Sequence, residues 1–237
     1  MDLARLRDEV CEANQELVRA GLVTLSFGNA SGVDRERGAL VIKPSGVAYA
    51  RLRPLDMVVV DLADGTVREG TYRPSSDTST HLELYRRYPS IGGVVHTHSS
   101  FASAWAQAGR PIPCLGTTHA DHFQGPVPVT RALTADEIHG DYERETGFVI
   151  IETLDDLALD PLKMPAVLVV SHGPFTWGAG PAEAAANAIA LEAVAAMAYR
   201  TTTLAPAVEP IAASLLERHF GRKHGPAAYY GQPAERH

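Results

Sequence analysis

The segment 90–99, with the sequence SIGGVVHTHS, constrains the fold of this chain more than any other stretch. A run of β-branched apolar residues that follows Pro89 and contains a pair of glycines is typical of a buried strand. The run ends in a His-x-His pair, and side chains two positions apart on a strand lie on the same face. His96 and His98 can therefore direct both imidazoles to one point, as a metal ion requires. The alternative is two ordinary polar residues at the end of a strand.

A second apolar run, 166–170, also leads to a histidine. His172 follows it directly after Ser171 and precedes a Gly-Pro pair that is expected to break the strand. Three histidines at the ends of two strands, with Asp77 or water as a further donor, offer a divalent ion the nitrogen and oxygen ligands typical of catalytic zinc. Structural zinc normally uses cysteine, and the two cysteines of this chain lack C-x-x-C spacing.

The bulk composition predicts one α/β domain over residues 1–237. Hydrophobic residues make up 45% of the chain and charged residues 21%, and no linker, repeat or low-complexity tract divides it. The net charge of -7 argues against a nucleic-acid partner, because phosphate backbones require a basic surface. We expect no membrane association, since there is no signal peptide and no apolar span of about 20 residues. Two widely separated cysteines fit a cytoplasmic location.

Hydrophobic periodicity and turn residues predict the order of the elements. Helices are expected over 2–20, 78–87, 100–108, 181–199 and 208–220. Strands are expected over 39–43, 56–62, 66–70, 90–99, 148–152 and 166–170. Residues 25–31 are expected to form a polar turn, and Asp64–Gly65 a hairpin turn. This pattern favours a sandwich of helices on a mixed sheet, and the absence of G-x-G-x-x-G after any strand argues against NAD.

Three polar loops, 28–29, 43–46 and 75–76, carry groups suited to a phosphate. Free N–H groups and the positive end of a helix dipole attract anions, and Lys43 adds a point charge. The alternative role for 75–77 is to cap the following helix. A phosphorylated substrate beside an open metal site is the resulting hypothesis, with the metal ion acting as a Lewis acid. The sequence offers several proton carriers without choosing among them: Asp77, Asp121, Glu143, His219, Tyr229 and Tyr230.

Several longer stretches closely resemble the L-ribulose-5-phosphate 4-epimerases of the class II aldolase superfamily. The resemblance extends over 3–232 and rests on 22–25, 41–47, 73–78, 89–99, 116–121, 171–175, 223–225 and 228–232. It implies an α/β class II aldolase-like sandwich with a central, mostly antiparallel mixed sheet flanked by helices. It also implies a cyclic homotetramer with active sites between subunits, to which the tail 222–232 contributes. The implied role lies in carbohydrate metabolism, in arabinose catabolism, ascorbate catabolism or another pentose route.

Carried over by position, the resemblance gives each candidate residue a role. His96, His98 and His172 become the ligands of one zinc or manganese ion, with Asp77 at or near the metal. Asp121 and Tyr230 become the acid/base pair, with Tyr230 supplied by the adjacent subunit. The resemblance assigns six residues to the phosphate: Asn29, Lys43, Ser45, Gly46, Ser75 and Ser76. It places Thr117 and His219 in the rest of the substrate pocket.

The resemblance implies zinc-dependent epimerisation of L-ribulose 5-phosphate and D-xylulose 5-phosphate at C4. In this isomerase reaction the C3–C4 bond breaks in a retro-aldol step and re-forms after the aldehyde has turned, without a redox cofactor. One alternative is an aldolase that cleaves a deoxy-ketose 1-phosphate such as fuculose 1-phosphate, but those relatives have glutamate where Asp77 stands. The other is a non-catalytic adducin-like scaffold, which lacks the metal histidines. The chain departs from the family at His122 and Gln124, beside Asp121, and in the tail 233–237.

Overall fold

The computed structural model describes residues 3–225 and 228–229. Within this part of the chain, strands form a seven-stranded sheet of order β4-β3-β2-β1-β5-β7-β6, in which all neighbouring strands are antiparallel. The strands are β1 (Asn29–Asp34), β2 (Ala39–Ile42), β3 (Val58–Asp61), β4 (Val67–Glu69), β5 (Gly93–His96), β6 (Ala166–Val169) and β7 (Gly173–Gly178). The predicted α/β fold with a largely antiparallel central sheet is confirmed.

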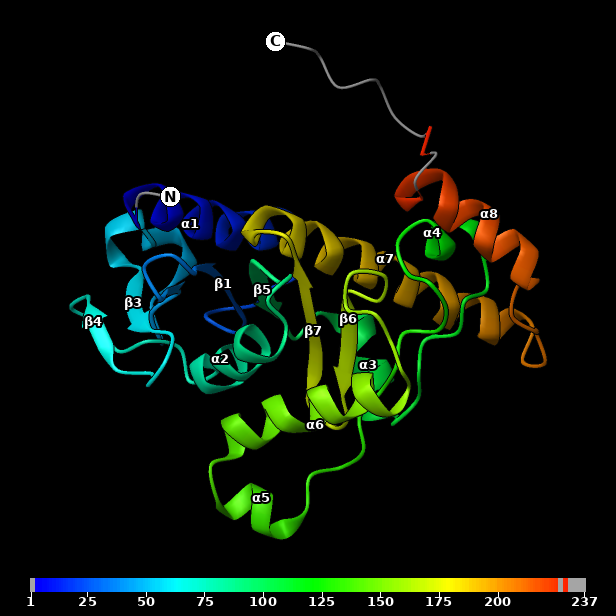
Figure 1. Cartoon of the computed structure of the whole chain (residues 1–237). Helices are drawn as coiled ribbons and strands as arrows, with labels where there is room; N and C mark the ends of the chain where they lie inside the picture. Colours follow the sequence, from blue (N-terminus) through cyan, green and yellow to red (C-terminus); the bar gives the residue numbers. More distant parts are fainter. Residues whose placement is uncertain (1–2, 226–227, 230–237) are drawn as a thin grey trace.

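Helices cover both faces of the sheet (Figure 1). They are α1 (Leu3–Arg19), α2 (Thr78–Arg87), α3 (Ser100–Gln107), α4 (Thr117–Ala120), α5 (Ala135–His139), α6 (Tyr142–Asp156), α7 (Pro181–Leu204) and α8 (Ala213–His224), with short 3₁₀ turns at Tyr49–Arg51 and Pro54–Asp56. Figure 1 shows α1 and α7 along one side and α2 and α6 along the other. None of the helices in the described residues is long and apolar enough to cross a membrane.

Strand β2 is buried at every residue, which explains why its sequence is continuously apolar rather than alternating. Ile42 of β2 packs in one cluster with Tyr85 of α2 and Ile150 of α6. Its neighbour Val41 points to the opposite face and packs with Val10 of α1. Successive residues of β2 therefore contribute to two apolar layers, one on each face of the sheet.

Two strands beside the site differ from the prediction. Residues 25–31 were expected to be a turn, but β1 begins at Asn29 and lies between β2 and β5. The strand has small residues because helices approach it closely: a Cβ atom on Gly32 would lie 2.8 Å from side-chain atoms of both Leu6 and Pro181. The Gly-Pro pair at 173–174 was expected to break the strand before it, and β6 does end at Val169, but the pair also opens β7, a strand that was not predicted. Proline is tolerated near the start of a strand.

The prediction of a strand over 148–152 was wrong, since these residues lie within α6. A short apolar run cannot be assigned to strand or helix from its composition alone. The deciding signal is Asp141, whose carboxylate caps the helix by accepting a hydrogen bond from the N–H of Arg144 at 3.3 Å. Smaller differences are α4 and α5, which were not predicted, α7, which extends to Leu204, and α8, which begins at Ala213 and continues past Gly221 to His224.

Candidate active site

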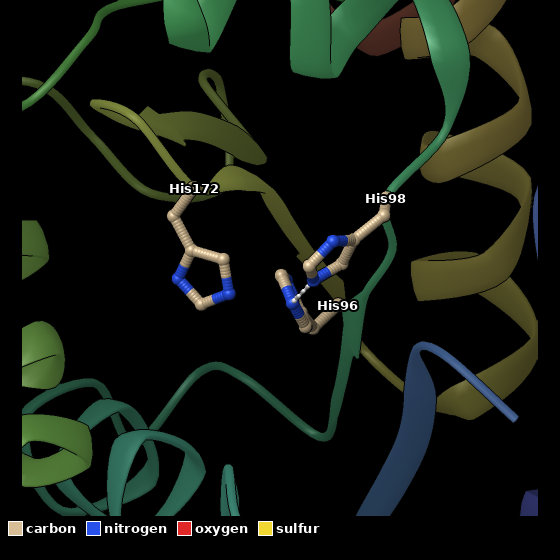
Figure 2. Close-up of side chains that lie close together, drawn as sticks. All are labelled: His96, His98 and His172. Atoms are coloured by element: carbon tan, nitrogen blue, oxygen red, sulfur yellow. Dashed lines mark hydrogen bonds between the residues drawn. The ribbon is translucent and has the colours of Figure 1, made fainter.

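His96, His98 and His172 meet at one edge of the sheet (Figure 2). His96 is the last residue of β5, His98 lies two residues beyond it, and His172 lies in the turn between β6 and β7. The antiparallel pairing of β5 with β7 brings the three together, with His96 opposite Phe175. One ring nitrogen from each histidine lies within 4.8 Å of the others. Such a group of nitrogen donors matches the ligands of a zinc-type metal ion.

His96 and His172 each have one ring nitrogen that faces the other histidines, while the second ring nitrogen has a hydrogen-bond partner elsewhere. Nδ1 of His96 lies 3.0 Å from the carbonyl oxygen of Pro174, to which it can donate, so Nε2 keeps its lone pair. That Nε2 atom lies 2.9 Å from Nε2 of His98. Burial lowers the pKa of His96 to about 4, against the opposing effect of Asp77, and burial also lowers the pKa of His172. Both imidazoles are therefore neutral at neutral pH, the form that binds metals.

The three polar loops line the same pocket as the histidines. The volume of this pocket is about 350 Å³. Two backbone hydrogen bonds hold the loops together, from the N–H of Ser75 to the carbonyl of Lys43 at 3.0 Å and from that of Ser45 to the carbonyl of Arg73 at 2.9 Å. The predicted phosphate residues in its wall are Asn29, Lys43, Ser45, Gly46, Ser75 and Ser76. The fold thus brings the two predicted halves of the site into one cavity.

Lys43 is a buried cation, with 2% of its surface exposed. Its ammonium group lies 3.3 Å from the carbonyl oxygen of Pro44, 3.4 Å from that of Ser26 and 4.7 Å from the centre of the Tyr49 ring. Among the described residues, no carboxylate forms an ion pair with it. Burial lowers the pKa of Lys43 to about 8, although Asp77 opposes this effect. An anionic ligand would supply the counter-charge that this side chain lacks.

Asp77 lines the pocket but lies outside the group of three histidines. It precedes α2 without capping that helix through its side chain. Its carboxylate accepts a hydrogen bond of 2.6 Å from the amide of Asn29, which also donates to Ser75 at 3.0 Å. Burial alone would raise the pKa of Asp77, but His96, His81 and the Asn29 hydrogen bond hold it below its usual value. Asp77 is therefore an anion beside the histidines, and its role as a metal ligand stays a prediction.

Asp121, Thr117 and His219 do not line this pocket within one chain. Asp121 follows α4, and its carboxylate accepts hydrogen bonds from His219 at 3.1 Å and Arg222 at 2.7 Å, both on α8. Burial would raise the pKa of Asp121, but these two partners hold it below its usual value. The predicted partner Tyr230 lies outside the described residues. The structure thus groups Asp121 with His219 and separates both from the histidine pocket.

Two residues from the first turn of α6, Tyr142 and Glu143, also line the pocket. Glu143 was among the candidate proton carriers, whereas Tyr142 was missed because no helix was predicted before the expected strand at 148–152. The signal that could have placed both on a helix is Asp141, a typical helix cap directly before them.

The chain is similar over most of its length to proteins of one family. Residues 8–199 match the family described as Class II Aldolase and Adducin N-terminal domain. L-ribulose-5-phosphate 4-epimerase UlaF of Salmonella paratyphi B is 57% identical over 230 residues, which cover 97% of this chain and 100% of that protein. The protein of the same name from Salmonella typhi has the same identity and coverage.

Solved structures of aldolases have the same fold. An L-fuculose 1-phosphate aldolase superposes with a TM-score of 0.77 and 22% identity, covering 92% of this chain and 95% of that one. The L-fuculose-1-phosphate aldolase of Thermus thermophilus gives a TM-score of 0.64 and 26% identity, with coverage of 88% and 100%.

Proposed function

Because this chain belongs to the class II aldolase and adducin family, we propose that it is a metal-dependent L-ribulose-5-phosphate 4-epimerase. It would interconvert L-ribulose 5-phosphate and D-xylulose 5-phosphate, as expected from relatives that bear this name and are 57% identical to it. The observation that carries the proposal is one pocket that holds both three clustered histidines and a buried lysine without a carboxylate partner among the described residues. The first group suits a metal ion and the second suits a phosphate.

The donor atoms around the pocket fit a divalent metal ion. The histidines supply nitrogen ligands, two of them with lowered pKa values, and the nearby Asp77 supplies negative charge. His96, His98 and His172 would hold one zinc ion, or manganese in its place, with Asp77 at or near it. When bound, the ion would act as a Lewis acid that stabilises negative charge developing on the substrate's oxygen atoms.

Lys43 and the polar loops would hold the phosphate of the sugar. The ammonium group of Lys43 supplies positive charge. Ser75 and Ser76 lie just before Asp77, the N-cap residue of α2, and the positive dipole end of this helix attracts anions. Asn29, Ser45 and Gly46 complete this wall of the pocket. A phosphate held there would anchor one end of the substrate and leave its carbon chain directed along the pocket that the histidines also line.

The proposed reaction breaks and re-forms the C3–C4 bond. A base removes the proton of the C4 hydroxyl, the bond opens to glycolaldehyde phosphate and the enediolate of dihydroxyacetone, the aldehyde turns, and an acid on the opposite face protonates the new hydroxyl. Asp121 and Tyr230 would be this acid/base pair. Within one chain Asp121 lies outside the pocket, so the reaction needs a second subunit. We infer a cyclic homotetramer in which Asp121, Thr117 and His219 of one subunit complete a neighbour's pocket, and in which Tyr230, in the tail 222–232, comes from the subunit adjacent to the one that supplies Asp121.

A coupled assay tests this function. The purified protein with zinc should convert L-ribulose 5-phosphate to D-xylulose 5-phosphate, and removal of the metal by a chelator should abolish the conversion. Fuculose 1-phosphate serves as the contrasting substrate. Faster cleavage of fuculose 1-phosphate than epimerisation of the pentose would mean that the protein is an aldolase instead.

A further inference from the structure

We propose that Tyr142 is a positioning residue for His172: its hydroxyl accepts a hydrogen bond from Nδ1–H of His172 and so presents Nε2 of that imidazole to the metal ion. The Tyr142 hydroxyl lies 3.4 Å from Nδ1 of His172. The inference rests on the metal site in the proposed function, and it gives a role in that site to Tyr142, which has none in the proposed function.

The orientation of the His172 ring supports this role. Figure 2 shows that one nitrogen of His172 faces His96 and His98, whereas the other faces away from them. A neutral imidazole carries one proton. When Nδ1 carries that proton and donates a hydrogen bond to the Tyr142 hydroxyl, the lone pair of Nε2 is free for the metal. His96 follows the same rule, because its Nδ1 lies 3.0 Å from the carbonyl oxygen of Pro174.

His172 needs such a partner more than His96 does. His96 belongs to β5, is 1% exposed, and stacks on Phe175 with ring centres 4.3 Å apart. His172 instead projects from a turn, directly after Ser171, whose φ of 60° lies in the left-handed region. The backbone and its packing therefore restrict the ring of His172 less than that of His96. A hydrogen bond to a fixed side chain would reduce this rotational freedom.

Tyr142 itself is held in place by the packing of α6. Its carbonyl oxygen accepts a hydrogen bond of 2.8 Å from the hydroxyl of Thr146, one turn further along α6. On the side that faces α2, the hydroxyl of Thr80 donates to the carbonyl of the next residue, Glu143. Gly147 lets the two helices come close, because a Cβ atom there would lie 2.9 Å from Cβ of Glu83. The first turn of α6 is thus a rigid base for the phenol.

The length of the contact sets the size of the effect. Loss of a partner that orients a metal ligand typically weakens metal binding by about 10 to 100-fold. A separation of 3.4 Å is long for a hydrogen bond, so the effect should lie at the lower end of that range. We therefore expect Tyr142→Phe, which removes only the hydroxyl, to raise the Kd for zinc about tenfold.

The test measures zinc binding to metal-free protein by competition with a chromophoric chelator. Tyr142→Phe should bind about tenfold more weakly than the wild type, and its cobalt-substituted form should have an altered visible spectrum. The matched control is Tyr199→Phe on α7, a side chain 54% exposed, which should change neither. A Kd for Tyr142→Phe within about twofold of the wild type, with an unchanged cobalt spectrum, would overturn the proposal.

Nuclear magnetic resonance of the wild-type protein tests the same point without a variant. In the zinc-loaded protein the ring of His172 should carry its proton on Nδ1, and a metal bond at Nδ1 would refute the proposal. The measurements also separate this inference from the proposed function. A wild-type protein that binds no divalent metal would refute both. Normal zinc binding without conversion of L-ribulose 5-phosphate would refute the epimerase function alone.

Discussion

Replacing Lys43 with methionine separates the binding role of this lysine from any role in stability. Methionine is unbranched and of similar length, so it can fill the same buried space beside Tyr49 without the charge. The native ammonium group is desolvated, and its nearest acceptors are two carbonyl oxygens at 3.3 and 3.4 Å. The variant should therefore melt at the same temperature as the wild type or higher, because no ion pair is lost and a buried charge is removed.

The kcat/KM of Lys43→Met should fall, although the stability of the variant is maintained. A hydrogen bond between charged groups contributes about 1.5 to 3 kcal/mol, which corresponds to a loss of about 10 to 150-fold in kcat/KM. Because the phosphate is remote from the bond that breaks, most of this loss should appear as a higher KM. Zinc content should stay at the wild-type value, since Lys43 lies outside the histidine group.

The pH dependence gives an independent check on Lys43. Burial lowers its pKa to about 8, so the free protein loses this positive charge as the pH rises through about 8. The KM of the wild type should increase above that pH, whereas the KM of Lys43→Met should show no such rise. Steady-state kinetics between pH 6 and 10 would measure both. An unchanged kcat/KM in the variant, or a borohydride-trapped covalent adduct of substrate on Lys43, would contradict a phosphate-binding role.

Three further predictions address the metal, the interface and the fold. His98→Asn should lose both bound zinc and activity, as measured by elemental analysis and the coupled assay, and retained activity would show that this ligand is wrongly assigned. Asp121→Asn and Tyr230→Phe should each reduce epimerisation by about 10² or more. An equal mixture of the two variants, refolded together, should recover about a quarter of wild-type activity if each site takes Asp121 from one subunit and Tyr230 from the adjacent one. No recovery in confirmed mixed tetramers would place both groups in one subunit. Ile150 lies in the core between α6 and the sheet, so Ile150→Ala should lower the free energy of unfolding in urea by about 2 to 5 kcal/mol. The control is Phe148→Ala at a partly exposed position, and a loss for Ile150→Ala no greater than that of the control would argue against this packing.

Local patterns in the sequence were sufficient for the three histidines and the polar loops that line the pocket. Each of His96, His98 and His172 follows a buried apolar run, and such runs place their ends at the edge of a sheet. Likewise, the polar loop 43–46 directly follows strand β2, and the polar loop 75–76 comes shortly before helix α2. Short-range rules therefore identified the wall of the pocket before its shape was known.

The missing parts depend on contacts between distant residues. Residues 25–31 were predicted to form a turn because they are polar and contain a glycine, yet Ser31 is fully buried in β1 and bonds to His81 at 2.7 Å. Similarly, the apolar residues of α6 match a strand until the packing of Ile150 against α2 and the sheet is known. Local propensity cannot include such long-range packing. The local cap at Asp141 does indicate this helix, and Tyr142 was overlooked because that signal was not used.

The pairing of β5 with β7 joins segments that are separated in the sequence by α3, α4, α5, α6 and β6. Contacts between distant segments form slowly during folding, because the intervening chain must first be closed into a loop. His96 and His98 lie on one side of this loop and His172 on the other, so the unfolded chain offers a metal ion at most a pair of neighbouring imidazoles from this group. Tight metal binding should therefore appear late in refolding, after β7 has joined β5, and its rate would report when the sheet is complete.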